Sequence, residues 1–545
     1  MVFIYFYALP ELEKHAHIPI LKESLWTTLD FYNHVILSKL QDKNRKWVIS
    51  SAIALSLVYF IHDRVLRPPK RLRHLPSTSP FQVILSALKS ESLFEYNKSQ
   101  VLPILHQENA SGLYTRLGPN GWEVCVCNPE DAKQVLFKIG SFPKAEIFTQ
   151  NKGTLGNRFS VGENIFIANG HDWKTQRTIA NPAFHRSMPV NMFGELSKTL
   201  FESMDKMGDT IEVTSLFRRF TLDAIGRAGF GFDFNATVDP NSKWVVCYDA
   251  INVALQDPLF FLFPVLEQKF LWMFPKRKAV HHQLTLFLEM MDDVIINKRQ
   301  EIQGGNTFNK DLNESEKDIL TLLIEAEQRG EGVMTDEVLK GNLCFFFLAG
   351  HDTTTNALSF AVYYLATHPD VQERARKEAL TILGEDPVDI MPTLEQTKAM
   401  TYLNQIMKET LRLQPPAPRV FPRCIQEDTV LSGNLIPNGT NVIVDIYGLH
   451  HNEHVWEDPE NFNPDRFSEG DAPTKGTPWI PFSTGGRQCL GMNFSLVEQR
   501  VVLSMLLRKY EWSLPVGSPH REQILTRGTF LVGPKELDIT FKKRY

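Results

Sequence analysis

The chain has 545 residues, of which 43% are hydrophobic and 22% are charged, and its 58 basic and 63 acidic residues give a formal net charge of -5. This balance excludes the basic footprint that nucleic-acid binding requires, and the apolar fraction excludes general disorder. Six cysteines are too few for a disulfide-built scaffold, and no CxxC spacing indicates a structural zinc site. At about 150 residues per domain the length predicts three or four domains, or one large domain.

The N-terminal part of the chain contains a candidate membrane anchor. Segment 47–62, WVISSAIALSLVYFIH, has no Asp, Glu, Lys or Arg, and as an α-helix it would span about 24 Å. More basic residues follow it than precede it, which favours a cytoplasmic location for the rest of the chain. We predict a partly apolar leader over 1–46, a transmembrane helix over 47–62, a basic, Pro-containing linker over 63–76 and a single large domain over 77–545. The alternative for 47–62 is a buried helix of a soluble domain.

The pattern beyond the linker predicts a mainly α domain with small β-sheets, in the α+β class. Strand-like alternation over 112–127, with a turn at Pro119–Gly121, predicts a hairpin. Thr335 is a good N-cap for a long helix, and a further helix should begin after Gly491. The helices predicted between these points are 335–368, 370–384 and 393–415.

The segment around Cys489, PFSTGGRQCLG, has the features of a loop that presents a thiolate. Glycines expose backbone N–H groups, the following helix adds its N-terminal dipole, and Arg487 supplies a cation for an anionic ligand. A thiolate held in this way suits ligation of haem iron. The alternative is a free cysteine buried in a turn.

The same segment matches the pattern F-x-x-G-x-R-x-C-x-G at Phe482, Gly485, Arg487, Cys489 and Gly491. Together with four further motifs in the expected order, it makes the chain from about residue 72 onward resemble the cytochrome P450 superfamily of haem-thiolate monooxygenases. The resemblance implies the P450 fold, haem b with Cys489 as the axial ligand to its iron, and insertion of one atom of O2 into a substrate. It also implies that Phe482 contacts the haem and that Arg487 meets a haem propionate.

Three of the other motifs concern catalysis and the support of the cysteine loop. In the segment AGHDTT, the resemblance implies that Asp352 and Thr353 help to deliver protons for dioxygen activation. The E-x-x-R motif and the segment PENFNPDRF contribute Glu409, Arg412 and Arg466, which would form a buried structural network. We do not count these three as catalytic.

The resemblance implies further haem contacts in two places. One is an early helix of the domain, and the other is the stretch that follows the helix with the E-x-x-R motif. Trp173 and Arg177, four residues apart on one helix face, would both donate to a haem propionate. Arg423 is a further propionate partner, and Arg419 competes with it because the stretch that leads to Arg423 is one residue longer than usual.

Electrons must come from another protein. No GxGxxG segment opens a helix after a strand, and no cysteine cluster indicates an iron–sulfur centre. The resemblance implies a membrane-bound NADPH–cytochrome reductase and an endoplasmic-reticulum enzyme that crosses the membrane once, with a cytoplasmic catalytic domain. Arg500, Arg508 and Lys509 are candidates for the docking face, with ordinary solvated charges as the alternative.

The substrate is predicted only as a class. The stretch 257–275 is rich in aromatic and aliphatic residues, and three phenylalanines precede Ala349. If the family interpretation holds, the substrate is a lipophilic molecule that is steroid, terpenoid or fatty-acid-like, and it reaches the site from the membrane. Two alternatives are an isomerase or dehydratase acting on peroxides and a non-enzymatic haem-binding membrane protein. Candidate pocket residues are Ala417, Val420, Phe421 and Phe530.

Overall fold

A computed structural model describes scattered residues between 47 and 63 and the ranges 66–89, 91–118, 120–186, 188–304, 317–330, 334–468 and 479–545. It forms two compact units, residues 1–67 and residues 68–545. The predicted leader over 1–46 lies outside the described residues, and so does much of the predicted span over 47–62. Within the described part of the chain, no helix combines the length and the hydropathy that a membrane span requires. The anchor, the linker and the domain boundaries stay predictions.

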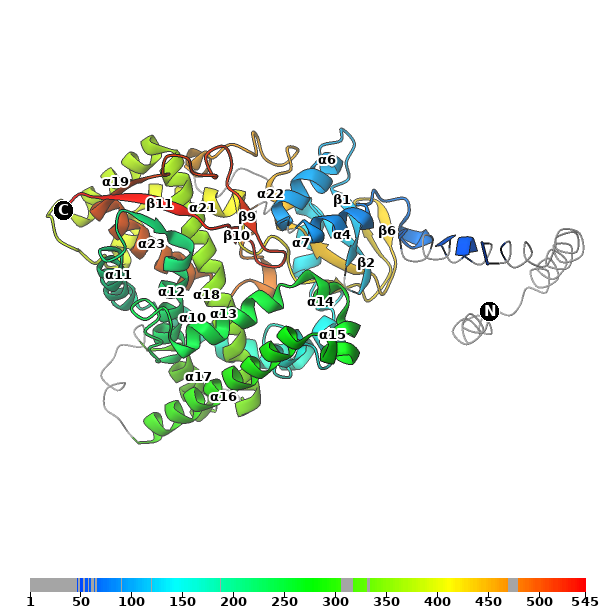
Figure 1. Cartoon of the computed structure of the whole chain (residues 1–545), viewed down its shortest axis with the longest axis horizontal. Coiled ribbons are helices and arrows are strands. Elements are labelled where there is room, and N and C mark those ends of the chain that lie inside the picture. Colours follow the sequence, from blue (N-terminus) through cyan, green and yellow to red (C-terminus); the bar gives the residue numbers. More distant parts are fainter. Residues whose placement is uncertain are drawn as a thin grey trace, which may run out of the picture. The chain divides into compact units, whose positions relative to one another are not determined.

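The larger unit is mainly helical with small sheets, which confirms the predicted fold class (Figure 1). Its helices up to residue 303 are α4 (Pro80–Leu88), α5 (Leu93–Tyr96), α6 (Leu102–Leu105), α7 (Pro129–Phe137), α8 (Ile147–Gln150), α9 (Leu155–Ser160), α10 (Gly170–Arg186), α11 (Val190–Met204), α12 (Val213–Ile225), α13 (Lys243–Leu255), α14 (Pro258–Leu262), α15 (Pro264–Phe270) and α16 (Pro275–Gln303). The later helices are α17 (Ile319–Gln328), α18 (Asp336–Thr367), α19 (Pro369–Leu383), α20 (Leu394–Ala399), α21 (Thr401–Leu413), α22 (Ile446–His450) and α23 (Met492–Lys509).

The strands form four small sheets in the described residues. The largest has the order β1-β2-β7-β4, in which β2 and β7 are parallel and the other pairs are antiparallel. Its strands are β1 (Leu113–Gly118), β2 (Gly121–Val126), β7 (Asn441–Val444) and β4 (Arg423–Cys424). The other sheets are β3 (Thr210–Glu212), β11 (Asp538–Lys543) and β8 (Tyr510–Ser513); β5 (Thr429–Leu431) and β6 (Asn434–Ile436); and β9 (Thr526–Arg527) and β10 (Gly533–Pro534). The hairpin predicted over 112–127 is confirmed as β1 and β2.

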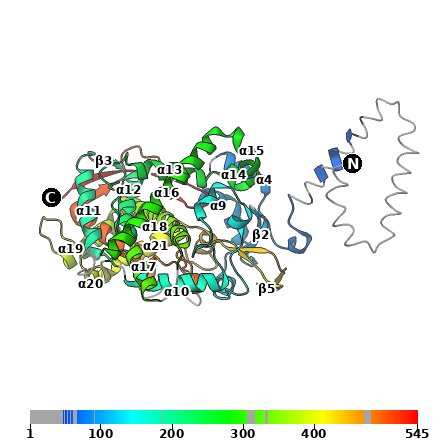
Figure 2. The same cartoon turned by 90° about the horizontal axis from the view of Figure 1, so that it is seen from below.

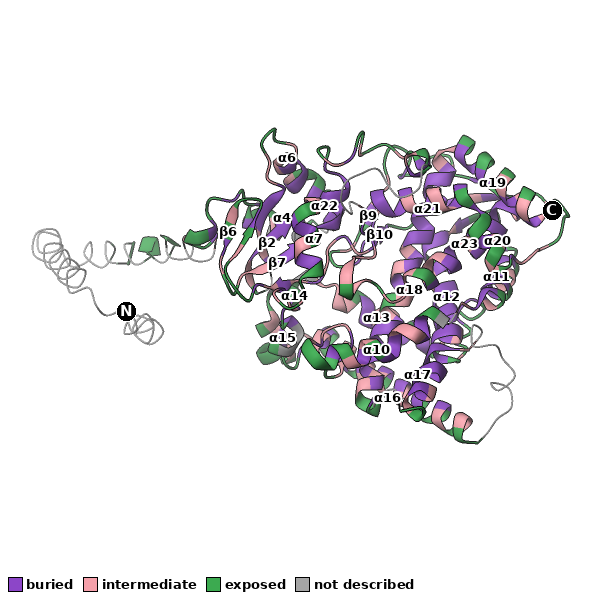
Figure 3. Ribbon diagram, turned by 180° about the vertical axis from the view of Figure 1, so that it is seen from behind, coloured by how far each residue is buried: buried purple, intermediate pink, exposed green. Residues whose placement is uncertain are grey.

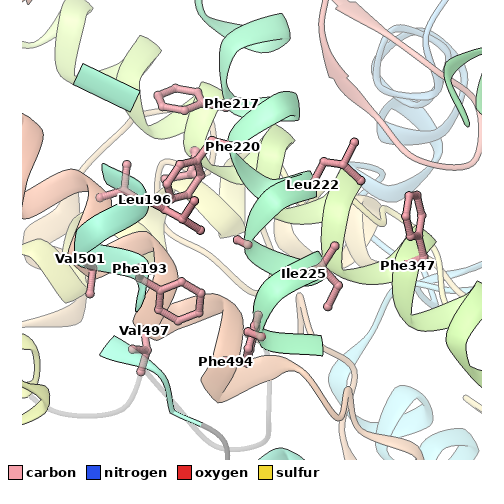
Figure 4. Close-up of a cluster of buried hydrophobic side chains, with 14 of the residues drawn as sticks. Phe193, Leu196, Phe217, Phe220, Leu222, Ile225, Phe347, Phe494, Val497 and Val501 are labelled. Carbon is pink, nitrogen blue, oxygen red and sulfur yellow. The ribbon is translucent and has the colours of Figure 1, made fainter. Parts of the chain in front are cut away.

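Helix α18 runs through the interior of the larger unit, where α12, α16 and α21 pack against it (Figure 2). Thr335 caps it, accepting a hydrogen bond from the backbone N–H of Val338, as the sequence predicts. Most residues of α18 and of the neighbouring helices α12 and α23 are buried (Figure 3). Phenylalanines of α11, α12, α18 and α23 share one apolar cluster, as Figure 4 shows for Phe193, Phe220, Phe347 and Phe494.

The helix predicted over 393–415 is two helices, α20 and α21. Met400 interrupts them with a non-helical ψ of 75°. The carboxylate of Glu378, from α19, accepts hydrogen bonds from the backbone N–H groups of Tyr402 (2.8 Å) and Leu403 (2.9 Å). These bonds satisfy N–H groups that a new helix N-terminus leaves without partners. A carboxylate from a different helix therefore fixes the start of α21.

A buried charge network holds α21 to the loop before the cysteine segment. Arg412 donates to Glu409 at 2.7 Å and 2.9 Å, and Arg466 donates to the same carboxylate at 3.0 Å. Arg412 also donates to the backbone carbonyls of Pro459 and His450. The side chains of Glu409 and Arg412 have no exposed surface. The predicted association of these three residues is confirmed.

We expect Glu409→Ala to lower the free energy of unfolding by about 3–5 kcal/mol, because it leaves two arginine side chains without their carboxylate. Urea denaturation followed by circular dichroism measures this loss. The control Lys398→Ala, which breaks the exposed pair with Glu395, should change it by less than about 0.5 kcal/mol. Equal effects of the two substitutions would contradict the structural role of the network.

Candidate active site

Cys489 lies in a tight loop three residues before α23. Its backbone N–H donates to the carbonyl of Phe482 at 2.9 Å. Gly485 in this loop has a φ of +72°, and a Cβ there would lie 2.7 Å from the carbonyl oxygen of Leu136 in α7. The loop therefore needs glycine at this position both for its backbone conformation and for its close approach to α7.

The thiol of Cys489 is available to a ligand. Of the six cysteines it is the only one that is exposed; Cys424 is half-buried and the other four are buried. The surrounding protein nevertheless restricts its hydration, and this burial raises the pKa of the thiol. A backbone hydrogen bond at Gly491 and the positive charge of Arg177 act in the opposite direction, since both favour the thiolate.

Four cations gather beside this loop: Lys144, Arg177, Arg423 and Arg487. Burial lowers the pKa of Arg487 to about 9, and the neighbouring Arg423 and Arg177 add to this shift. Burial also lowers the pKa of Arg423 to about 10. The pKa of Lys144 is held well below its usual range by burial and by the three arginines. Among the described residues, none of the four forms an ion pair with a carboxylate.

The arginines are oriented by neutral partners. Arg487 lies over the ring of Trp173, 4.0 Å from its centroid, and donates to the carbonyl of Ala168 at 2.7 Å. Arg177 donates to the carbonyl of Gln488 at 2.7 Å, and therefore joins α10 to the cysteine loop. The Nε and Nη1 atoms of Arg487 and the Nε atom of Arg423 are buried without a hydrogen-bond partner. These donors can bind an anionic group.

Arg423 and Arg419, which the sequence left as alternatives, have different surroundings. Arg423 is 1% exposed and lies in the cation cluster, where an isolated β-bridge pairs its backbone with that of Lys144. Arg419 instead forms an ion pair with Asp445 at 3.3 Å and donates to Asn97 at 2.7 Å. The geometry therefore favours Arg423 as the residue with free capacity for an anion.

Asp352 and Thr353 are neighbours in α18 but face different surroundings. Asp352 is 4% exposed and accepts hydrogen bonds from Tyr248 (2.8 Å) and Asn252 (3.1 Å), both in α13. Burial raises the pKa of Asp352, although Arg218 and these two bonds oppose the shift. Thr353 is partly exposed, and its hydroxyl donates to the carbonyl of Ala349 at 2.6 Å. The structure does not join the acid and the alcohol by a direct hydrogen bond.

The neighbouring Gly350 has a packing role. A Cβ at this position would lie 2.8 Å from Cδ1 of Ile225 in α12. The small residue therefore lets α12 approach α18 closely.

A cavity of about 250 Å³ lies between α18, the β1–β2 hairpin and the segment that contains α14 and α15. Phe345 of α18 lines it, whereas Phe347 is fully buried in the core. Of the pocket residues predicted from the sequence, Val420, Phe421 and Phe530 line the cavity and Ala417 does not.

The predicted docking role of Arg508 is wrong. Its side chain is 1% exposed and donates to the backbone carbonyls of Gly384, Asp386 and Val388. A buried arginine that holds a loop cannot present its charge to a partner protein.

Comparison with known proteins identifies the family. The family model for cytochrome P450 matches residues 76–541. The chain is 27% identical to human cytochrome P450 4F12 over 501 residues, which cover 87% of this chain and 90% of the relative. It is 30% identical to dog cytochrome P450 3A12 over 413 residues, which cover 71% and 76% of the two chains. It is also 29% identical to the Arabidopsis thaliana protein LUTEIN DEFICIENT 5, chloroplastic, over 443 residues, with 78% and 71% covered.

The chain belongs to the cytochrome P450 family. It is therefore a monooxygenase of the oxidoreductase class, and it carries haem with a cysteine thiolate as the axial ligand. Cys489 is the cysteine of the segment that matches the pattern F-x-x-G-x-R-x-C-x-G. The positive charge of the cation cluster beside it is complementary to the negative charge of the haem propionates. Bound haem would bring two propionates, whose negative charges the described residues around the cluster do not supply, and the buried donors of Arg423 and Arg487 would hold them.

Sequence reasoning missed several residues of this P450 site. Nothing in the sequence distinguishes Lys144 from a solvated surface lysine, because its place in the cluster depends on pairing with the distant Arg423. Tyr248 and Asn252 are spaced by four in α13, which does indicate a shared helix face, but not which residue that face contacts.

We expect Arg423→Met to stabilise the haem-free protein by about 1–2 kcal/mol, because it removes a buried charge repelled by its neighbours. The same substitution should speed the loss of haem several-fold. Calorimetry of the haem-free protein and transfer of haem to apomyoglobin measure the two effects.

The matched control is Arg419→Met. It should destabilise the haem-free protein, because Asp445 is fully buried and loses its ion pair, and it should leave haem release nearly unchanged. Faster haem loss from Arg419→Met than from Arg423→Met would contradict the assignment.

Proposed function

We propose that this P450 hydroxylates a lipophilic small molecule of the steroid, terpenoid or fatty-acid-like class, with electrons from NADPH–cytochrome reductase. The observation that carries the proposal is the lining of the cavity next to α18. Just over half of its lining residues are apolar, with phenylalanine and leucine the commonest, and this lining favours an apolar occupant. Lys144 lies 3.7 Å above the ring of Phe166, which stacks on Phe345 of that lining, so the cation cluster and the cavity share one aromatic wall.

The residue roles in this proposal follow the sequence motifs, and the cation cluster supports those of the arginines. Cys489 binds the iron, Phe482 contacts the haem, and Trp173, Arg177, Arg423 and Arg487 hold its propionates. The bound haem supplies the oxidative chemistry. Asp352 takes up and releases protons at its buried carboxyl, and the Thr353 hydroxyl, whose own proton is directed to Ala349, accepts and passes on protons at the partly exposed surface of α18.

We further propose that the enzyme associates with the endoplasmic-reticulum membrane and takes its substrate from it. Apolar side chains are exposed along α14, α15 and the short 3₁₀ helix Leu271–Met273, with Trp272 75% exposed. The same segment contributes Phe260, Phe261 and Pro264 to the cavity. A lipophilic molecule dissolved in a bilayer next to this face would have a short apolar path to the cavity.

We expect the reduced protein with CO to show a strongly red-shifted Soret band, and Cys489→Ser to abolish it because the axial thiolate is lost. NADPH-dependent product formation should require the reductase, and substrates can be found by screening lipophilic compounds for a spin-state shift. Turnover of a hydroperoxide without any electron donor would refute the proposal in favour of an isomerase or dehydratase.

We expect Thr353→Ala to keep the CO band but to lose at least tenfold in the product formed per NADPH consumed, because a proton-relay group is missing. Thr381→Ala is the matched control, since this exposed threonine of α19 makes the same bond to the carbonyl four residues earlier. Normal coupling in Thr353→Ala would rule out its role in proton delivery.

A further inference from the structure

A chain of hydrogen bonds runs from the cavity wall to the buried acid of α18. Gln256, the residue directly after α13, lines the cavity, and its side-chain Nε2 donates to Oδ1 of Asn252 at 3.2 Å. Asn252 lies one helical turn earlier and also lines the cavity, and its Nδ2 donates to Asp352 Oδ1 at 3.1 Å. The chain Gln256–Asn252–Asp352 therefore connects the lining of the cavity to a carboxylate.

The carboxylate fixes the direction of both amides. The two oxygens of Asp352 accept hydrogen bonds, one from Tyr248 and the other from Asn252. Because an ionised carboxylate only accepts, Asn252 turns its N–H group toward Asp352 and its carbonyl oxygen toward Gln256. That carbonyl oxygen in turn requires the N–H group of Gln256. The last polar atom of the chain, Oε1 of Gln256, is thereby fixed as a hydrogen-bond acceptor.

This acceptor is accessible and unused. Gln256 is partly exposed, and within the described part of the chain its Oε1 accepts no hydrogen bond and is not one of the buried atoms that lack a partner. It lies beside a turn at the cavity wall, since a Cβ on Gly528 would be 3.1 Å from it and the Thr529 hydroxyl donates to the backbone carbonyl of Gln256 at 3.4 Å. Thr529 and Phe530 of this turn line the cavity with Gln256. A ligand in the cavity can therefore reach the acceptor.

The charged groups of the cavity lining, in contrast, are engaged in ion pairs. The pairs are Glu91–Lys89 (3.7 Å), Arg116–Glu123 (3.2 Å), Glu267–Arg277 (2.7 Å) and Arg419–Asp445 (3.3 Å). A neutral amide oxygen is left to interact with the substrate, and such an oxygen selects for a group that can donate a proton.

We propose that Gln256 is a specificity-determining residue that binds a hydroxyl group of an otherwise apolar substrate. A hydroxyl can donate to Gln256 Oε1, whereas the matching ketone has no proton to donate and would place its own oxygen against another acceptor. The site thus selects an alcohol over the corresponding ketone. This inference rests on the proposed function and narrows its substrate class.

The bound hydroxyl would extend the chain that ends at Asp352. Hydrogen bonds in a chain polarise one another, so the negative charge of Asp352 strengthens the acceptor at the far end. The direction of the amides and the strength of the acceptor therefore have the same origin in one carboxylate.

The test compares matched ligands on the intact, haem-loaded enzyme. Affinities of 2-dodecanol and 2-dodecanone, and of testosterone and androstenedione, are measured by equilibrium dialysis and by spin-state titration. In at least one pair the alcohol should bind about five- to tenfold more tightly than the ketone. The assignment is wrong if each pair shows equal affinities, a preference for the ketone or no measurable binding.

Two substitutions connect this preference to the residues. Gln256→Met should weaken binding of the alcohol about fivefold and leave the ketone unchanged, because only the alcohol loses a hydrogen bond. Asn252→Leu removes the group that fixes the direction of the Gln256 amide, so the amide can turn its N–H group to a ketone. The ketone should then bind more tightly than it does to the unsubstituted enzyme. A merely structural defect would weaken both ligands alike, and that result would count against the assignment.

Controls separate this inference from the proposed function. Gln283→Met repeats the substitution at a partly exposed glutamine of α16 that does not line the cavity, and it should preserve the preference. Absence of the CO-shifted Soret band from the unsubstituted enzyme would refute the haem-thiolate function itself. An enzyme with that band and with NADPH-dependent oxidation of these compounds, but with no alcohol preference, would refute only the role of Gln256.

Discussion

Uncompensated positive charge beside the cysteine loop is the constraint on which the rest of the active site depends. Lys144, Arg177, Arg423 and Arg487 repel one another in a partly buried place, and the chain balances them with no described carboxylate. Packing must hold them together: Trp173 supports Arg487, and backbone carbonyls accept from the guanidinium groups. The folded chain therefore stores electrostatic repulsion that an anionic cofactor relieves. Cofactor binding and correct folding of this region are energetically linked.

The cysteine loop has two supports of different kinds. Backbone geometry is one, since Gly485 brings the loop against α7 in a conformation that other residues rarely adopt. The buried charges of Glu409, Arg412 and Arg466 are the other, because they hold the preceding chain to α21. Neither support touches the sulfur, yet both determine where it lies.

What could be predicted from the sequence is what a short motif encodes. The Cys489 loop, the Glu409–Arg412 pair and the long helix after Thr335 follow from local spacing, and the structure places them as expected. The break at Met400 could not be predicted, because it depends on the carboxylate of Glu378 in another helix. The positions of Lys144 and Tyr248 depend on contacts between distant segments, and such contacts leave no periodicity in the sequence.

The two hydrogen bonds that α13 gives to Asp352 connect this buried acid to the cavity. Helix α13 also lines the cavity, through Asn252 and Leu255, so an incoming molecule meets the same helix that holds the acid. If α13 moves away, Asp352 loses two donors that favour its charged form, and its affinity for a proton rises. The acid strength of Asp352 thus depends on the position of α13, the helix whose Asn252 both donates to this acid and lines the cavity.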